Sequence, residues 1–504
     1  VYVMLRRITG AVGVALSVTL LFTWSYYVWT VGLFAEVYAP QLLTLAAVGL
    51  LLAGMMSPGV SVGASRVAGG SKPPAEMGNL RLPLSPLKGL KQPTSPAQRV
   101  DRDPRPVLPK AENVLQGLPP AFSAPLVGFQ NHLARGLQPL ATGSKTSLPL
   151  LTGLMYGIAV AMHPASILFA PGMAVCFRLA RVSWRRSALA ATLAALIVLG
   201  SLLYFPLRFH ADPALNLAGS YDAAGSFVPR DLATPEGVVW MISGRQFGGL
   251  FFAEGVLPTA GQLVELLVLF AGNWLGFGVV IGLYGLFVLW RGSSPPSEWG
   301  RGNATCRAGW GRGLLWGWIA LFAPYTLFYA TYGAGDRQLM FGPSLLLWTV
   351  PLAVGLREII RQMAPRWRVA VLVILPALAL AVNFPLLDLS GDFSVRERSA
   401  LFMQAVPQEA VVFARWHDIT PLEYLHTVEG VRPDLRLYNL FLFPTETLRP
   451  YLQSLIAAGE VVWLVDVDPV PLLPGVSFEE ITLTPDNPDV PGFTVYAVGE
   501  PPGL

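Results

Sequence analysis

The sequence is short of charge, cysteine and histidine, and each shortage excludes a class of protein. Only 13% of its 504 residues are charged, whereas soluble globular chains contain about a quarter. The two cysteines, Cys176 and Cys306, are too few and too far apart for a disulfide framework, and the five histidines make no metal-ligand spacing. The formal net charge is only +4, and the arginines cluster between apolar runs rather than in one basic patch. We therefore expect no metal, no cofactor and no nucleic-acid partner.

Long apolar runs are what the sequence has instead, since 53% of its residues are hydrophobic. A helix needs about 20 apolar residues to cross a bilayer. Runs close to this length lie at 9–29, 39–56, 186–207, 263–290, 313–332, 343–354 with its flanks, and 369–384. A further run at 148–180 is broken by His163-Pro164, so it forms either one kinked span or a hairpin of two short spans. These runs predict an integral membrane protein.

Clusters of arginine favour the hairpin. Basic loops of membrane proteins face the cytoplasm, and such clusters lie at 6–7, 178–186, 291–312 and 357–368. All of them face the cytoplasm only if the run at 148–180 crosses the membrane twice. The sequence then predicts a multi-pass protein of the cell membrane with about nine spans, with His163 at an outer turn and an extracytoplasmic C-terminal domain.

The predicted fold is an α-helical multi-pass membrane bundle followed by a small α/β soluble domain, and the chain divides accordingly. Residues 1–56 hold the first two spans. Residues 57–146 are rich in Pro, Gly and Ser and basic, so they cannot bury enough apolar surface to fold and are expected to form a disordered cytoplasmic insertion. Residues 147–386 complete the bundle, with an external loop at 208–262 whose aromatic pattern suits helices lying on the membrane surface. Residues 387–504 form the soluble domain.

Strand-like and helix-like segments alternate in the soluble domain. Strands are expected at 410–414, 435–443 and 461–467, and helices at 396–406, 421–429 and 446–458. Such alternation indicates a small parallel α/β layer. Thr420, Pro421 and Glu423 have the spacing of a helix N-cap, first helical residue and capping-box acid, so a helix is expected to begin there.

Three polar residues fall at the outer membrane boundary in separate parts of the chain. Glu36 follows the first span, and is either a group that accepts protons or binds substrate hydroxyls or a simple interfacial acid. His163 is either a phosphate ligand or a turn residue before proline. Arg245, in the external loop, is either a phosphate-binding guanidinium or an arginine that reaches to the membrane surface. Since all three share one depth, we expect them to line one outward-facing cavity.

Two further acids have alternative interpretations. Asp336, next to Arg337 between two spans, either forms a local ion pair or lines the same cavity. Asp418 follows the first strand of the soluble domain, where parallel sheets place ligands, although turn chemistry explains an aspartate there equally well.

Several ordered motifs resemble one family. Residues 35–39, AEVYA, resemble that family's "AEVYA" element, and residues 153–171, GLMYGIAVAMHPASILFAP, its "GL..GLA..HHP....LP" hairpin. Residues 204–208 and 243–247 resemble its "LYLPLR" and "RRQY", and Asp418 through 434 its "D...YLQ.VEGVRPDV". The family is the broad bacterial membrane family of unknown function that includes the eukaryotic transmembrane O-mannosyltransferases, within the GT-C glycosyltransferase class. The resemblance runs from about residue 24 to 439 and skips the insertion.

This resemblance implies a glycosyltransferase that moves a sugar from a polyprenyl-phosphate donor in the bilayer to a protein or glycan acceptor on the outer face. It implies a GT-C-like bundle in which Glu36, Tyr38, His163, Arg245 and Asp336 bind substrate. The catalytic residue is not identified. Members of this class begin with a span and an outer loop bearing a "GDSGE"-like acidic element, and this chain, which starts at Val1, has none. If a pair of spans at the front is missing, the predicted number of spans rises from nine to eleven.

Two other classes remain open at this stage. The missing acidic loop favours the hypothesis of a truncated, non-catalytic membrane scaffold. A transporter of lipid-linked glycans loses weight because the sequence has no inverted repeat and no chain of ionisable residues through the spans.

Overall fold

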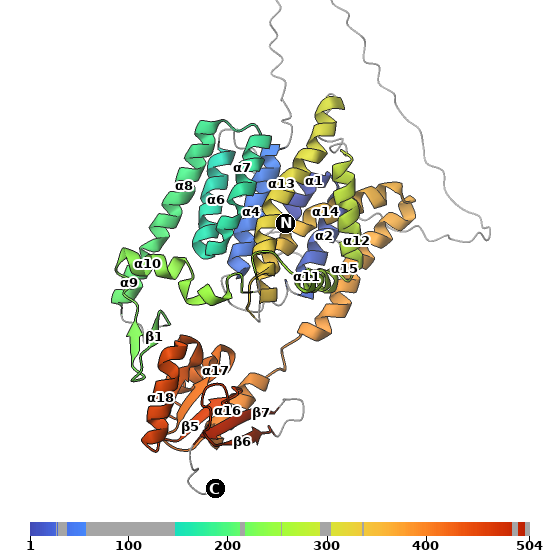
Figure 1. Ribbon diagram of the computed structural model, residues 1–504. Coiled ribbons are helices and arrows are strands. Elements are labelled where there is room, and N and C mark those ends of the chain that lie inside the picture. The colour runs from blue at the N-terminus through green and yellow to red at the C-terminus, as the bar shows by residue number, and fades with distance from the viewer. Residues whose placement is uncertain are drawn as a thin grey trace, which may run out of the picture. The chain divides into compact units, whose positions relative to one another are not determined.

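The computed structural model describes residues 1–26, 28, 38–56, 147–211, 217–253, 255–292, 304–334, 337–485 and 492–498. The insertion predicted at 57–146 lies outside these residues. The described part is mostly helical, with a small sheet region near the C-terminus (Figure 1). The helices of its N-terminal part are α1 (Tyr2–Thr9), α2 (Val12–Thr23), α4 (Tyr38–Met56), α6 (Leu148–Met162), α7 (Ala170–Leu179), α8 (Trp184–Leu202) and α9 (Tyr204–His210). Those that follow are α10 (Pro235–Ile242), α11 (Ala260–Asn273), α12 (Phe277–Trp290), α13 (Ala304–Ala330), α14 (Gly342–Gln362) and α15 (Pro365–Leu387).

Several of these helices are long and apolar enough to cross a membrane. Within the described residues these are Trp184–His210, Gly311–Ala330, Arg337–Gln362 and Pro365–Leu387, and the bent pair Ala260–Asn273 and Phe277–Trp290 adds one more if it forms one span. Shorter apolar helices are Val12–Thr23, Pro40–Met56, Leu148–Met162 and Pro164–Leu179. The count of nine spans stays a prediction.

Small residues let the helices of the bundle approach closely. A Cβ atom at Gly285 of α12 would lie 1.9 Å from the carbonyl oxygen of Pro351 in α14. A Cβ atom at Gly153 of α6 would lie 2.2 Å from the carbonyl oxygen of Ala190 in α8. Such backbone contact between helices is typical of membrane proteins, where packing replaces the hydrophobic effect as the force between helices. The small side chains therefore determine which helices are neighbours.

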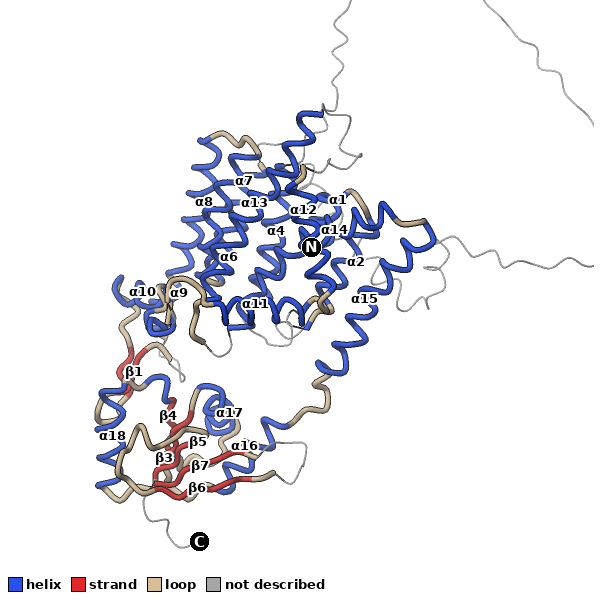
Figure 2. Tube along the Cα trace, turned by 45° about the vertical axis from the view of Figure 1, so that its right-hand side comes forward, coloured by secondary structure: helices blue, strands red, loops and turns tan. Residues whose placement is uncertain are grey.

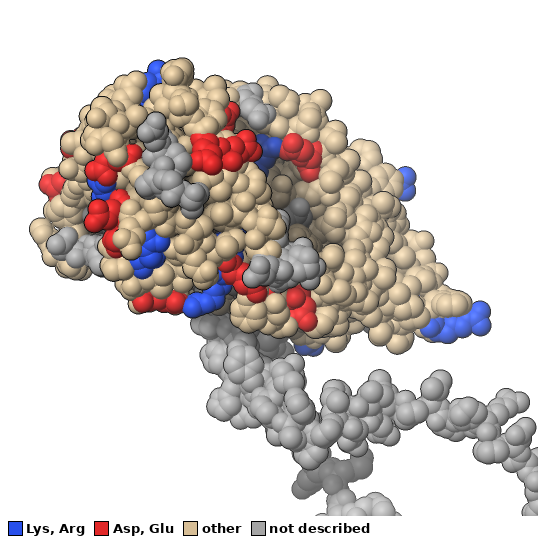
Figure 3. Space-filling model, turned by 90° about the horizontal axis from the view of Figure 1, so that it is seen from below, with Lys and Arg blue, Asp and Glu red and all other residues tan. Residues whose placement is uncertain are grey.

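The innermost helix is α14, while α8 and α15 lie at the periphery. Leu345, Leu352 and Leu356 of α14 are fully or almost fully buried. By contrast, α8 and α15 expose most of their apolar side chains, including Leu199 and Val369. In Figure 3 acidic and basic side chains mix on the face seen from below, and a broad surface without charged side chains extends beside it. An exposed apolar surface of this kind suits contact with lipid.

The break expected at His163-Pro164 is present. Helix α6 ends at Met162, His163 is extended, and the short 3-10 helix η3 (Pro164–Phe169) leads into α7. The hydroxyl of Tyr156 donates to the carbonyl oxygens of Ser166 and Ile167 at 3.1 and 3.2 Å, so the chain folds back across the turn. With 15 residues in α6 and 10 in α7, each arm is shorter than an ordinary span.

Two expected spans are broken. The run at 263–290 forms α11 and α12, which meet at 106°, because Leu275 and Gly276 adopt left-handed backbone conformations with φ of 52° and 69°. The first run begins later than expected, since Gly10 (φ 65°) ends α1 and α2 starts only at Val12. Composition predicted both runs but not these breaks.

The loop predicted to be external is structured in its described residues, as expected, and contains an unexpected β-hairpin. Strands β1 (Gly219–Tyr221) and β2 (Phe227–Pro229) pair antiparallel, and α10 and the 3-10 helix η4 (Arg245–Leu250) follow. The ring of Tyr221 stacks on Phe443 at 4.5 Å, and the Thr447 hydroxyl donates to the Tyr221 carbonyl at 3.1 Å. The hairpin therefore contacts the C-terminal domain.

The C-terminal domain is a five-stranded sheet with helices on both faces (Figure 2). Its elements are α16 (Ser394–Ala405), β3 (Val411–Ala414), α17 (Trp416–Thr427), β4 (Arg436–Asn439), η7 (Leu440–Leu442), α18 (Thr445–Ala457), β5 (Val462–Val465), β6 (Phe478–Leu483) and β7 (Phe493–Val498). The strand order is β4-β3-β5-β7-β6. The three predicted strands are parallel, as expected, whereas β6 and β7 add an antiparallel edge that the sequence analysis missed.

The predicted capping box at Thr420 is wrong. Helix α17 begins a turn earlier, at Trp416, and contains Pro421 in its interior. The Thr420 hydroxyl donates backwards to the Trp416 carbonyl at 2.7 Å and caps nothing. The earlier start lets Ile419, which is fully buried, pack into the core beneath the helix. Packing therefore overrides the local capping signal.

Candidate functional site

The beginning of α4 lies against the His163 turn. Nε2 of Gln41, in the first turn of α4, donates to Oγ of Ser166 in η3 at 2.9 Å, and both side chains are fully buried. Gln41 lies three residues after Tyr38, and Ser166 lies three residues after His163. Two of the stretches that carry predicted site residues are therefore neighbours.

The C-terminal half of α13 packs against the same turn. The ring of Phe169, at the end of η3, stacks on Tyr325 of α13 at 4.7 Å. The Tyr325 hydroxyl donates at 3.1 Å to the carbonyl of Met340, in the 3-10 helix η6 (Arg337–Phe341) that precedes α14. Next to these contacts, the hydroxyls of buried Thr326 and Ser344 form a hydrogen bond of 2.8 Å. One end of α13 thus joins the His163 turn to the segment after Asp336.

The segment η4, which begins at Arg245, reaches the same end of α13. The backbone N–H of Gly333 donates to the Leu250 carbonyl at 2.9 Å. The ring of Phe251 lies 5.9 Å from Phe328 and 5.8 Å from Tyr332. These contacts bring the segment that follows α10 to the end of α13, a few residues from Arg245.

A guanidinium that the sequence analysis treated only as a neighbour of Asp336 also lies here. Arg337 donates to the Tyr332 carbonyl at 3.1 Å and pairs with Glu265 of α11. The alternative of a local ion pair between Asp336 and Arg337 stays untested, because Asp336 lies outside the described residues. The Arg337 side chain is mostly buried, and it lies directly beside the end of α13.

The predicted site residues have different outcomes. Glu36 and Asp336 lie outside the described residues. Tyr38 begins α4, but its side chain is not described. His163 is half-buried at its turn, and Arg245 is exposed at the first position of η4. The structure joins the chain segments that carry these residues, and the convergence of the five side chains themselves stays a prediction.

Sequence reasoning missed a row of tyrosines at this site. Tyr325 and Tyr329 of α13 contact each other at 4.9 Å, and Tyr332, two residues after the helix ends, contacts Tyr329 at 5.8 Å. Their i, i+4, i+7 spacing was a readable signal, because residues at this spacing share a helix face. All three tyrosine side chains are buried, so they form the packed interior of this helix end. We define the α13 end site as the His163 turn, the starts of α4 and η4, η6 and these tyrosines.

A second polar cluster surrounds Asp418 in the C-terminal domain. Nη2 of Arg398 donates to Oδ1 of Asp418 at 3.1 Å and also pairs with Asp466, the first residue after β5. Nε2 of His417 lies 3.0 Å from Oδ2 of Asp418. Burial raises the pKa of Asp418, against the opposing effect of His417 and Arg398. Asp418 therefore lies at the carboxyl end of β3, as the sequence indicated, in the first turn of α17.

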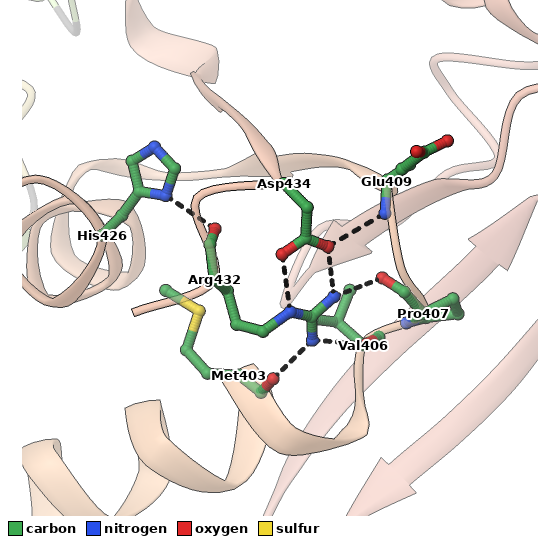
Figure 4. A network of polar contacts seen from close by, with 7 residues as sticks. All are labelled: Met403, Val406, Pro407, Glu409, His426, Arg432 and Asp434. Carbon is green, nitrogen blue, oxygen red and sulfur yellow. Dashed lines mark hydrogen bonds and ion pairs between the residues drawn. The ribbon is translucent and has the colours of Figure 1, made fainter. Parts of the chain in front are cut away.

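The Arg432-Pro433-Asp434 part of the family-like motif has a structural role (Figure 4). The Arg432 guanidinium donates to the carbonyls of Met403, Val406 and Pro407 at 2.7 to 2.8 Å. The same guanidinium binds both carboxylate oxygens of Asp434. Because the last carbonyls of a helix have no partners within it, Arg432 completes the end of α16.

The described residues contain no group of three His, Cys, Asp or Glu side chains that could hold a metal ion. No family model matches the chain, and no curated protein or solved structure matches it either. The class of protein follows from the fold alone. It is a helical protein with several apolar helices of membrane-spanning length and an α/β domain near its C-terminus.

Proposed function

We propose that this protein transfers a sugar from a polyprenyl-phosphate donor to an acceptor at the outer face of the cell membrane. The observation that carries the proposal is the α13 end site, where the His163 turn, η6 and the segment that begins at η4 contact the end of α13, and the start of α4 contacts the His163 turn. Three of these stretches bear His163, Arg245 and Arg337. The apolar exterior of the bundle suits the polyprenyl chain of such a donor.

The chemistry of transfer needs groups of this kind. An inverting glycosyl transfer requires a base at the acceptor hydroxyl and positive or hydrogen-bonding groups at the leaving phosphate. Guanidinium groups bind phosphate with paired donors. In this proposal Arg245 and His163 bind the donor phosphate, Glu36 and Asp336 face the acceptor, and Arg337 holds the site together through Tyr332 and Glu265. The bundle has nine spans and the C-terminal domain is extracytoplasmic.

The test uses the purified full chain in nanodiscs with mannosylphosphoryl-undecaprenol. Release of undecaprenyl phosphate together with a mannosylated acceptor supports transfer. Movement of intact donor between leaflets of proteoliposomes would instead identify a transporter, and binding with neither outcome would identify a scaffold. Arg245→Gln is expected to weaken donor binding roughly tenfold or more, as loss of a charged hydrogen bond does. Arg291→Gln, an exposed arginine at the end of α12, is the matched control and should leave binding unchanged.

A further inference from the structure

In the C-terminal sheet, the chain runs from the carboxyl ends of neighbouring strands to opposite faces of the sheet. After β3 the chain enters α17, whose Ile419 and Leu422 pack with Val412 on one face. After β4 it enters α18, and after β5 it enters a loop with Val467; both pack with Val411 and Phe413 on the other face. In open α/β sheets, ligands bind in the crevice that opens at such a reversal, beyond the carboxyl ends of the strands.

At this edge of the sheet one buried carboxylate oxygen has no hydrogen bond. The side chain of Asp418 is only 7% exposed. Its Oδ1 accepts from Arg398, whereas its Oδ2 accepts no hydrogen bond from any described group. The contact of Oδ2 with His417 is an ion pair only while that exposed histidine is protonated. Since a buried acceptor without a donor is costly and Oδ2 is covered, a ligand hydroxyl would donate to Oδ2 by replacing its contact with the exposed His417 side chain.

Exposed aromatic rings lie at the same strand ends. Trp416 follows β3 and is 43% exposed, and Phe441 follows β4 and is 39% exposed. Their rings meet edge to face at 5.7 Å. On the far side of Phe441 lies Phe247 of η4, at 5.3 Å, two residues from Arg245. The strand ends therefore contact the segment that leads to the α13 end site.

We propose that this edge, around Trp416 and Asp418, binds a neutral saccharide that serves as the acceptor. The apolar face of a sugar ring stacks on an exposed aromatic ring, and its hydroxyl groups donate to carboxylates. The two positive charges of Arg398 and the nearby Arg415 offset the two negative charges of Asp418 and Asp466, so this edge has no strong preference for a charged ligand. This inference rests on the proposed function only in naming the saccharide as the acceptor of the transfer.

The experiment measures saccharide binding to the full chain in nanodiscs without donor, by saturation-transfer NMR with mannobiose, cellobiose and lactose as probes. At least one disaccharide should show saturation transfer. Trp416→Ala should weaken its binding roughly tenfold, the loss of about one stacking contact, and Trp416→Phe should restore most of it. Asp418→Asn should weaken binding to a similar extent. Tyr424→Ala removes another exposed aromatic ring of α17 and is the control that should not change binding.

Three results would overturn the inference. They are saturation transfer from none of the disaccharides, equal binding by Trp416→Ala and the parent chain, and quenching, by lipids with nitroxide headgroups, of the part of the fluorescence that Trp416→Phe removes. The last result would place the ring in the membrane interface. Since Trp416→Ala lies away from the α13 end site, it should bind undecaprenyl phosphate normally. Failure of saccharide binding and failure of donor binding are therefore measured separately.

Discussion

The Arg432 guanidinium holds the Asp434 carboxylate with two hydrogen bonds of 2.9 and 2.8 Å, while its other donors reach the end of α16. Asp434 in turn accepts from the backbone N–H of Glu409 at 3.0 Å. This pair connects the loop before β3, the loop before β4 and a helix end. The Arg432-Pro433-Asp434 segment thus has a structural role in this domain.

Replacing Arg432 should destabilise the C-terminal domain. Arg432→Met leaves three carbonyls and Asp434 without their donor, which costs about 3 kcal/mol of unfolding free energy. Arg432→Lys should recover little of this, because an ammonium cannot bind both oxygens of Asp434 and the helix end together. The measurement is denaturant-dependent proteolysis of the domain in the full chain. Arg436→Met, which removes an exposed pair with Glu460, is the control and should cost less than about 1 kcal/mol.

The same pair predicts how the domain responds to acid. Hydrogen bonds from Arg432, then from the Glu409 N–H, hold the pKa of Asp434 well below its usual value. A lowered pKa in the folded state gives stability that is present above the unfolded pKa, near 4, and that is lost as pH falls below it. Asp434→Asn should therefore remove part of the acid sensitivity between pH 4 and pH 2. An unchanged pH profile of unfolding would contradict this role.

Some of these features were predictable from sequence, and others were not. The apolar runs predicted α8, α14 and α15, and proline predicted the break at His163, because both signals act locally. The bend at Leu275 was not predictable, since a left-handed leucine is set by the packing around it and not by its own preference. The hairpin β1–β2 had a weak sequence signal in Asp222 and Gly225. In the turn, Oδ1 of Asp222 accepts from two backbone N–H groups, and Gly225 has a φ of 75°.

The same limit applies to the candidate site. Residues such as His163 and Arg245 could be proposed from their depth and chemistry, but Gln41 and Arg337 could not. Their positions depend on contacts with Ser166 and Glu265, which are distant in sequence.

Gly285 should be intolerant of larger side chains. Gly285→Val places a Cβ atom into the backbone of α14, so the helices must separate, which costs about 3 kcal/mol or more. The expected result is loss of monodisperse protein on size exclusion in detergent. Gly200→Val is the control, because a Cβ atom at Gly200 of α8 meets nothing within 4 Å. If both variants behave like the parent chain, α12 and α14 do not approach each other this closely.

The bond from Gln41 to Ser166 should support both stability and donor binding. Gln41→Leu removes a buried hydrogen bond worth about 1 kcal/mol and loosens the start of α4 from the His163 turn. A lower melting temperature is expected together with weaker binding of undecaprenyl phosphate. Thr44→Val is the control, since the Thr44 hydroxyl bonds only carbonyls of its own helix. Normal donor binding by Gln41→Leu would show that this hydrogen bond does not support donor binding.

The most direct test of the central claim is photolabelling with undecaprenyl phosphate that carries a diazirine beside the phosphate. The protein is used as the full chain in nanodiscs, and labelled peptides are identified by mass spectrometry. If the α13 end site binds the donor phosphate, the label appears in 38–41, 163–169, 245–251 and 325–341, and excess unlabelled donor removes it. Labelling confined to the lipid-facing surfaces of α8 and α15, unaffected by competition, would contradict the account.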